Sequence, residues 1–313
     1  MSMVMAAPAA AARARRRRVR GGDNLAGYMF LLPWLGGLSL FVAGPALVSL
    51  YLSFTNYDLL DTPRWVGAQN YVRMFTTDAR YAHALRVTLA YVALAVPLNL
   101  VASLALAVAL NRRMGGVGFY RSVFYVPSLL GGSVAVSILW RQLFGLGGLL
   151  SRLLDLVGIH GVSLVSSPGS AIWPLILLHV WQFGSPMVIF LAALKQVPAE
   201  LYEAAAIDGA GRWQRFAVIT VPMLTPVILF NLVLQVINAF QAFTPSFIIS
   251  GGTGGPLDST LFYTLYLYIQ GFANLRMGYA AAMGWVLVVM IGAATALIFL
   301  SSRFWVHYED GGR

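Results

Sequence analysis

Four amide side chains recur at helical spacing within one long apolar stretch of the chain. They are Asn231, Gln235, Asn238 and Gln241, separated by four, three and three residues. At 100° per residue, these steps keep the four within about one third of the circumference of a helix. Each amide offers both donors and acceptors, which suits sugar hydroxyls, and the neighbouring Phe240 and Phe243 could stack on a sugar ring. The competing interpretation, held with equal weight, is that the amides hold helices together within or between subunits.

A second polar group lies in the preceding apolar stretch, at His179, Trp181, Gln182 and Ser185. Trp181 and Gln182 are candidates to line the same path as the four amides. His179 is the only ionisable side chain well inside an apolar stretch. A neutral histidine bonded to a neighbouring helix is favoured over contact with a ligand, because charges and unpaired polar groups are costly at membrane depth.

Residues 203–222 form a short polar island between two very apolar stretches. Glu203 suits the positive end of a helix, and the three alanines that follow it have high helix propensity and little bulk. Gly209 and Gly211 are expected to end this helix by adopting a positive φ, and a second helix is expected from Arg212. The pattern predicts a helix–turn–helix that a partner surface can approach closely.

The composition places these groups in a membrane protein. Of the 313 residues, 59% are hydrophobic and only 10% are charged, whereas a soluble domain has about 25% charged residues. Cysteine is absent, which excludes disulfides and thiolate metal sites. The net charge of +10 does not indicate nucleic-acid binding, because six of the 21 basic residues lie in the first 20 positions and no basic face with interleaved aromatics follows.

Six charge-free stretches are long enough to cross a bilayer, which takes about 20 apolar residues in a helix. They are residues 28–54, 87–110, 122–140, 171–194, 216–250 and 277–302. The fifth is too long for one straight crossing, so we expect surface helix or loop at its ends. Residues 259–275 are also free of charge but shorter and preceded by a glycine-rich turn, so we expect a surface or re-entrant helix there.

The distribution of basic residues predicts the orientation of these spans. With the amino terminus inside, 14 of the 21 Lys and Arg residues fall on the cytoplasmic side and seven on the outer side. This bias follows the positive-inside rule. It places both termini and the 203–222 loop in the cytoplasm.

The sequence lacks the residues that would power transport or catalysis within this chain. The single lysine, Lys195, follows a leucine, so there is no phosphate-binding Gly-Lys-Ser/Thr loop. Neither His-Glu-x-x-His nor Gly-x-Ser-x-Gly occurs, which argues against a membrane-embedded enzyme. All eleven acidic residues fall outside the six spans. This argues against the alternative of an ion- or proton-coupled secondary carrier of small polar solutes, because such carriers commonly hold the coupling ion with carboxylates at membrane depth.

Residues 203–222 resemble the EAA loop of permease subunits of binding-protein-dependent ABC importers. That loop has Glu-Ala-Ala, three residues, Gly, nine residues, Ile, one residue and Leu-Pro. Every spacing is matched here, and the one departure is Val221 in place of Leu. The residues that the resemblance assigns to coupling with an ATPase are Glu203, Ala204, Ala205, Asp208, Gly209, Ile219 and Pro222.

Other segments extend the resemblance to residues 25–305. Residues 67–75 are similar to the Gly-Leu-x-Asn-Tyr segment of carbohydrate-type permeases, with Ala68 in place of Leu, and residues 254–256 and 278–282 match their last-loop pattern. The likeness is closest to the maltose and glycerol-3-phosphate permeases. It implies an all-α membrane protein with six transmembrane helices over residues 25–305, including the coupling loop 198–222. A basic cytoplasmic tail, residues 1–24, and a short one, residues 306–313, flank it.

The resemblance also implies partners and a location. The chain would sit in the bacterial inner membrane beside a homologous permease, usually a paralogue, and would receive a sugar from an extracytoplasmic solute-binding protein. Two ABC ATPase subunits would bind ATP and Mg²⁺, so this chain would need no cofactor of its own. The Glu203–Gly209 helix would dock in a cleft of the ATPase and transmit its closure to the spans.

Overall fold

The computed structural model describes residues 21–111, 116–156, 158, 160, 161 and 163–307. The described part is mainly helical, with one pair of two-residue strands, which confirms the predicted all-α membrane class. The chain divides into two compact units, Met1–Ser49 and Leu50–Arg313. The six arginines of the predicted basic tail and most of the predicted carboxyl-terminal tail lie outside the described residues.

The first unit is formed by one interrupted helix that continues across the unit boundary. The helix α1 (Gly21–Leu38) passes through a π-helical turn, η1 (Ser39–Ala43), into α2 (Gly44–Ser53). The 26 residues from Tyr28 to Ser53 are long and apolar enough to cross a membrane, as predicted for 28–54. Apolar side chains along it are exposed, for example Phe30 at 87%, which suits a helix surrounded by lipid or by partner helices.

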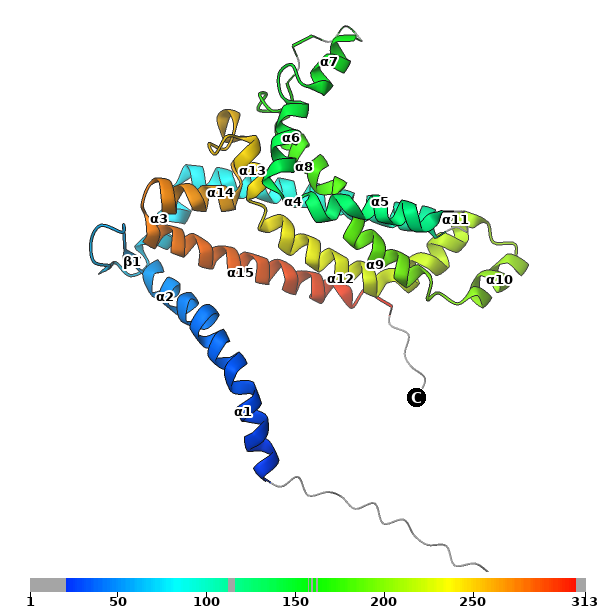
Figure 1. Ribbon diagram of the computed structural model, residues 1–313, viewed down its shortest axis with the longest axis horizontal. Coiled ribbons are helices and arrows are strands. Elements are labelled where there is room, and N and C mark those ends of the chain that lie inside the picture. Colours follow the sequence, from blue (N-terminus) through cyan, green and yellow to red (C-terminus); the bar gives the residue numbers. More distant parts are fainter. Residues whose placement is uncertain (1–20, 112–115, 157, 159, 162, 308–313) are drawn as a thin grey trace, which may run out of the picture. The chain divides into compact units, whose positions relative to one another are not determined.

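After the end of α2, the second unit continues with a pair of short strands and a short helix that lead into a long helix (Figure 1). The strands β1 (Thr55–Asn56) and β2 (Arg64–Trp65) pair antiparallel. The short helix α3 (Gln69–Thr76) then leads into α4 (Ala79–Leu110), which contains the predicted span 87–110. Asp78 is the N-cap of α4, and its side chain accepts a hydrogen bond from the backbone N–H of Tyr81, one of the donors that a helix start leaves unpaired.

The third predicted span is not one helix. Residues 122–140 belong to α5 (Val117–Leu130) and α6 (Val134–Phe144), followed by α7 (Leu149–Leu156). The prediction of a continuous helix was wrong because Gly131-Gly132-Ser133 interrupts it, and the Ser133 side chain caps α6 at the N–H of Val136. The segment here with the length and apolarity of a span is Val134–Leu156.

The fourth predicted span is also broken. It consists of α8 (Ile172–Trp181) and α9 (Gly184–Leu194), which are bent by 41° relative to each other. The predicted span 171–194 is therefore present as a bent pair rather than a straight helix. With this pair counted as one span, the described residues hold six candidate membrane spans.

The remaining helices follow the predicted order. They are α10 (Ala199–Ile207), α11 (Arg212–Arg215), the π-helical η2 (Phe216–Thr220), α12 (Val221–Phe240), α13 (Thr244–Ile249), the 3₁₀ turn η3 (Pro256–Asp258), α14 (Tyr263–Tyr268), the π-helical η4 (Ile269–Ala273) and α15 (Met277–Ser302). Helix α12 ends before residue 250, as expected for a stretch too long for one crossing. Residues 259–275 form two short helices, neither long enough to span a membrane.

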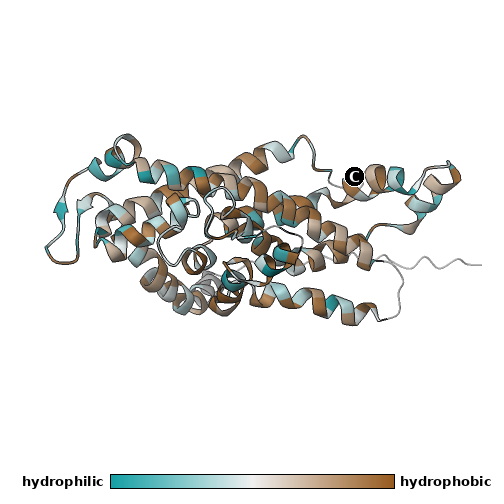
Figure 2. Cartoon of the chain, turned by 90° about the horizontal axis from the view of Figure 1, so that it is seen from above, coloured by the Kyte–Doolittle hydropathy of each residue, from teal (hydrophilic) through white to brown (hydrophobic). Residues whose placement is uncertain are grey.

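The core of the second unit is built around α4. Helices α8, α9, α12 and α14 pack against it, and buried side chains such as Tyr91, Leu175 and Phe262 fill the space between them. Large hydrophobic side chains of the long helices are also exposed, for example Val101 and Val289, and Figure 2 shows hydrophobic residues along these helices. This distribution is expected when the surrounding solvent is lipid.

Candidate functional site

The four predicted amides, three in α12 and Gln241 at its C-cap, line one cavity of about 530 Å³. Gln182, at the end of α8, lines it too, together with Ser128, Ser185 and Phe243. Trp181 does not line this cavity; it belongs to a separate one and lies with its ring centroid 5.4 Å from that of Trp140. The structure therefore brings five of the six predicted path residues together and leaves one apart.

Two of the four amides are bonded within the protein. Gln235 is buried, and its Nε2 donates to Oδ1 of Asn99 on α4 at 2.7 Å. Asn231 is 2% exposed, and its Nδ2 donates to the backbone oxygen of Val227 one turn earlier at 3.0 Å. For Gln235 this geometry is that of a side chain that joins two helices, which was the competing interpretation of the amide pattern.

The other two amides are available to a ligand. Asn238 and Gln241 are exposed in the cavity wall. Neither side-chain amide makes a hydrogen bond to any residue that the structure describes. Phe243, which also lines the cavity, presents a ring two residues after Gln241. The exposed half of the amide face therefore has free donors and acceptors beside an aromatic surface.

The break between α8 and α9 is stabilised by polar side chains from two other helices. Asn99 Nδ2 donates to the carbonyl of His179 at 2.7 Å, and Ser103 Oγ donates to that of Phe183 at 3.2 Å. Ser128 Oγ of α5 donates to the carbonyl of Gln182 at 2.9 Å and accepts from the N–H of Ser185 at 2.9 Å. Backbone groups freed inside a membrane need such partners, and interrupted helices of this kind often border binding sites in transporters.

The sequence analysis did not identify these three supporting residues. Asn99 and Ser103 are four positions apart in α4, so the helical period that revealed the α12 amides could have found them. Ser128 has no comparable pattern. Gly184 allows the close approach of α5, because a Cβ there would lie 2.6 Å from the carbonyl oxygen of Phe124.

His179 differs from its prediction. Its Nε2 is buried without a hydrogen-bond partner among the described residues, and its ring lies edge-on to that of Tyr91 with centroids 5.8 Å apart. The bond to a neighbouring helix is made by its backbone carbonyl rather than by its ring. The side chain is nevertheless part of the cavity wall.

The predicted helix–turn–helix is present as α10 and α11, which we call the hairpin (residues 198–222). Helix α10 ends in a Schellman motif, in which the N–H of Gly209 donates to Ala206 O and that of Ala210 to Ala205 O. Gly209 has φ +80°, as predicted. Gly211 has φ −68°, so the expectation of a positive φ was wrong there, because this residue precedes α11 as its N-cap.

The hairpin presents exposed side chains. Glu203, Ala204 and Asp208 are exposed, and Ile207 and Trp213 are exposed at 87% and 84%. A hydrogen bond of 2.9 Å between Tyr202 and Thr220 joins α10 to η2. Ile219 and Pro222 are partly buried near the base. The role of these residues in coupling stays a prediction.

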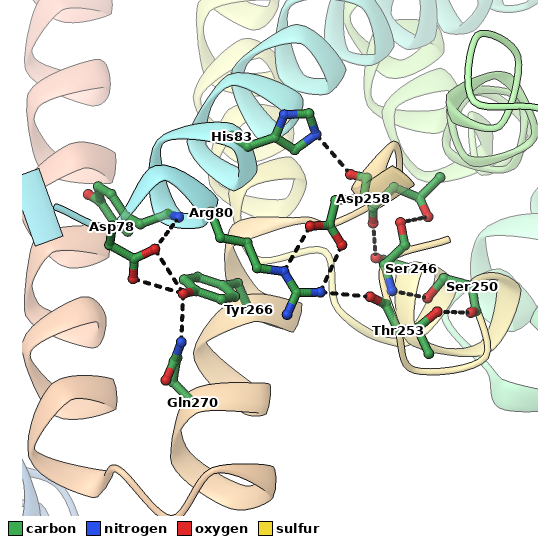
Figure 3. Close-up of polar contacts among 12 residues, drawn as sticks. Asp78, Arg80, His83, Ser246, Ser250, Thr253, Asp258, Tyr266 and Gln270 are labelled. Atoms are coloured by element: carbon green, nitrogen blue, oxygen red, sulfur yellow. Dashed lines mark hydrogen bonds and ion pairs between the residues drawn. The ribbon is translucent and has the colours of Figure 1, made fainter. Parts of the chain in front are cut away.

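A third polar cluster, which the sequence analysis missed, joins the start of α4 to the loop after α13, to α14 and to the start of α15. Figure 3 shows the part of it around Asp78, Arg80, Asp258 and Tyr266. The Asp78 carboxylate accepts from the hydroxyls of Tyr266 at 2.8 Å and Tyr279 at 2.6 Å. Arg80 pairs with Asp258 at 2.7 Å. Partial burial opposes the charged form of Asp78, but the bonds from Tyr279, the Tyr81 N–H and Tyr266 outweigh it and hold its pKa below the ordinary value.

The chain is similar in sequence to known membrane transport components. A family model described as the inner membrane component of binding-protein-dependent transport systems matches residues 117–310. The probable ABC transporter permease protein YesP of Bacillus subtilis (strain 168) is 53% identical, covering 92% of this chain and 94% of its own. The lactose transport system permease protein LacF of Rhizobium radiobacter is 34% identical, over 88% and 94%.

A solved structure shares the fold. A chain in the crystal structure of a bacterial ABC transporter involved in the import of the acidic polysaccharide alginate aligns with a TM-score of 0.78. The alignment covers 90% of this chain and 96% of that one, at 22% sequence identity. At this identity the likeness establishes a common architecture for the helices that surround the amide cavity.

Proposed function

This chain belongs to the family of inner membrane components of binding-protein-dependent transport systems, and we propose that it imports a sugar through the amide cavity. Its relatives are ABC transporter permeases, which are transport subunits and not enzymes. The chain is accordingly a multi-pass inner membrane protein of the carbohydrate-uptake type. In our proposal both termini and the hairpin lie in the cytoplasm.

The observation that carries the proposal is the exposed pair Asn238 and Gln241 in the cavity wall. Neutral amides can donate to and accept from sugar hydroxyls without a charge to desolvate, and the ring of Phe243 offers a face for the sugar ring. Of the buried pair, Gln235 joins α12 to α4 through Asn99, whereas Asn231 bonds within α12. A homologous permease would supply the opposite side of the path.

Energy enters, in this proposal, through the hairpin. Two ABC ATPase subunits bind ATP and Mg²⁺, and an extracytoplasmic binding protein delivers the sugar. The exposed Ile207 and Trp213 and the carboxylates of Glu203 and Asp208 are the surface that the ATPase would contact. The base of the hairpin continues directly into α12 through η2, so movement of the hairpin would be transmitted to the helix that carries the four amides.

The alternative is a carrier driven by an ion or proton gradient. Within the described residues, no carboxylate lines the amide cavity. The test is to purify the chain in mild detergent, identify the co-purifying proteins by mass spectrometry, and measure sugar uptake with a partner ATPase that binds but cannot hydrolyse ATP. We expect an ATPase in the complex and loss of uptake. Uptake that persists without ATP hydrolysis, and collapses with the ion gradient, would favour the carrier.

A further inference from the structure

A second cavity continues from the amide cavity toward the hairpin. It has a volume of about 710 Å³ and lies between α5 and α9. Ser185 and Ile189 line both cavities, so the two spaces meet along one face of α9. Lys195, which directly follows α9, and Arg121 of α5 line the far part.

Both charged residues in this wall are cations. Among the residues that line the cavity, none is acidic, and within the described ranges neither Arg121 nor Lys195 forms a salt bridge. Arg121 Nη2 donates to the carbonyl of Leu110 at 3.3 Å, which leaves its buried Nε without a partner. Lys195 is exposed. The pair therefore has unused donors and uncompensated positive charge.

The cavity that contains Trp181 has the same sign of charge. It measures about 920 Å³ and is lined by Arg141 and Arg152 and by no acidic residue. Asp155 lies on the same helix as Arg152, but its carboxylate contacts His160 instead. Trp181 lines this cavity and the adjacent Gln182 lines the amide cavity. An uncharged cavity thus lies between two cavities whose charged lining residues are all basic.

We infer that the substrate of this permease is an anionic saccharide, such as one that contains a uronic acid, and that Arg121 and Lys195 hold its carboxylate beyond the amides. This inference rests on the proposed function and names the substrate class. Cavities lined by one sign of charge concentrate ligands of the opposite sign, and guanidinium and ammonium groups form short, strong hydrogen bonds with carboxylates. A neutral sugar could accept hydrogen bonds from these cations but would gain no ion pair from them.

Because the chain contains no cysteine, a single introduced thiol can report the electrostatic potential where the two cavities meet. Ser185→Cys places one thiol where the two cavities meet, at an exposed position whose side chain makes no hydrogen bond to a described residue. In the assembled complex in nanodiscs, the rates of reaction of this thiol with an anionic and a cationic methanethiosulfonate are compared through the intact mass of this chain. Each rate is divided by the rate at which the same reagent reacts with a small thiol in solution, which removes the difference in intrinsic reactivity between the two reagents.

We expect the thiol to react faster with the anionic reagent than with the cationic one. The ratio of these two normalised rates should fall roughly fivefold when Arg121→Gln or Lys195→Gln removes one cation, because a unit charge several ångströms away in a wet cavity has an effect of this size. Arg121→Lys keeps the charge and should keep the ratio, which separates electrostatics from a loss of structure. Arg303→Gln removes a charge that lines neither cavity and should leave the ratio unchanged. A ratio equal in all four variants would overturn the inference.

Two matched sugars test the substrate class at the same thiol. Digalacturonate and galactobiose differ in carrying carboxylates in place of hydroxymethyl groups. We expect digalacturonate to protect the thiol at about tenfold lower concentration than galactobiose, and this advantage to disappear in the double variant Arg121→Gln/Lys195→Gln. Equal protection by the two sugars would refute the acidic substrate while leaving the ATPase and uptake tests of the proposed function untouched.

A lipid headgroup is the other anion that could occupy such a cavity. The protection experiment is therefore repeated in nanodiscs of phosphatidylcholine alone and with added phosphatidylglycerol. Our inference predicts that digalacturonate protects the thiol in both. Protection by phosphatidylglycerol together with none by digalacturonate would identify a lipid site and overturn the assignment to substrate.

Discussion

The hairpin and the amide cavity are stabilised in opposite ways. The turn of the hairpin is closed by bonds between near neighbours, such as that from Ala210 N–H to Ala205 O. The cavity wall depends on the bond that Asn99 donates to the carbonyl of His179, 80 positions away, and on the bond that it accepts from Gln235, 136 positions away. A local turn can therefore be altered without disturbing the packing of the helices. The bonds of the cavity wall, in contrast, also hold those helices together. We therefore expect hairpin variants to separate transport from assembly, and variants of the buried wall to affect both.

The largest expected effect is on transport, from a change in the hairpin. Gly209→Val should abolish sugar uptake with normal amounts of inserted subunit, because a β-branched residue does not readily adopt the φ of +80° found here. Gly211→Ala is the matched control, since φ at Gly211 is −68° and alanine can adopt it. Uptake, subunit amount and ATPase co-purification are measured together. Normal uptake in Gly209→Val would remove the turn from the mechanism.

The next effect should fall on assembly. Asn99→Leu removes the bonds to the carbonyl of His179 and from Gln235 and Ser103. Each buried group left unpaired costs about 1–3 kcal/mol, so we expect a marked loss of purified complex and equal loss of uptake for every sugar. Asn231→Leu, which removes only a bond within one helix turn, should cost far less. If Asn99→Leu gave the full yield of complex, the proposed difference between the locally stabilised hairpin and the cavity wall held by long-range bonds would be contradicted.

A smaller and more selective effect should follow from the exposed half of the amide face. Asn238→Leu keeps the helix and removes a free amide from the cavity wall. If this amide binds a sugar hydroxyl, its loss should lower uptake by about 5- to 150-fold, corresponding to roughly 1–3 kcal/mol. The size of the loss should differ between sugars that vary at one hydroxyl. A loss of uptake that is proportional to the loss of complex yield, and equal for all sugars, would show that Asn238 has a structural role like that of the buried amides.

The cluster at Asp78 should give the smallest effect, and it depends on pH. Because the folded pKa of Asp78 lies below its ordinary value of about 3.9, the charged carboxylate stabilises the fold above that value. The contribution is lost as pH falls through the folded pKa. Asp78→Asn should therefore lower the melting temperature slightly at pH 7, and the difference from wild type should shrink below about pH 4. A difference that grows on acidification would contradict this sign.

The hairpin and the helix positions were accessible from sequence because their signals are local. The Glu-Ala-Ala spacing, the glycine at residue 209 and the apolar stretches each depend on residues close together in the chain. The one-sided spacing of the α12 amides also predicted correctly that they would share a surface. Their division into a buried and an exposed pair was not predictable, because it depends on whether α4 covers each position.

The breaks in the third and fourth spans were also missed. The first has a local signal in Gly131-Gly132-Ser133, but both breaks are also supported by long-range contacts. At the first break, Gly131 leaves room for the side chain of Gln182, which a Cβ would overlap. At the second, Ser128 bonds to groups more than 50 positions away. Trp181 and Gln182 line different cavities, because neighbouring residues on a helix point about 100° apart.

The most direct test of this account compares two identical substitutions on one face of α12. Gln235→Leu and Gln241→Leu each remove one glutamine amide, the first bonded to Asn99 and the second free in the cavity. Complex yield and uptake of two sugars that differ at one hydroxyl are measured for both. The account predicts that Gln241→Leu keeps full yield and discriminates between the sugars, while Gln235→Leu lowers yield and affects both sugars alike. Uniform loss that follows yield in both variants would contradict it.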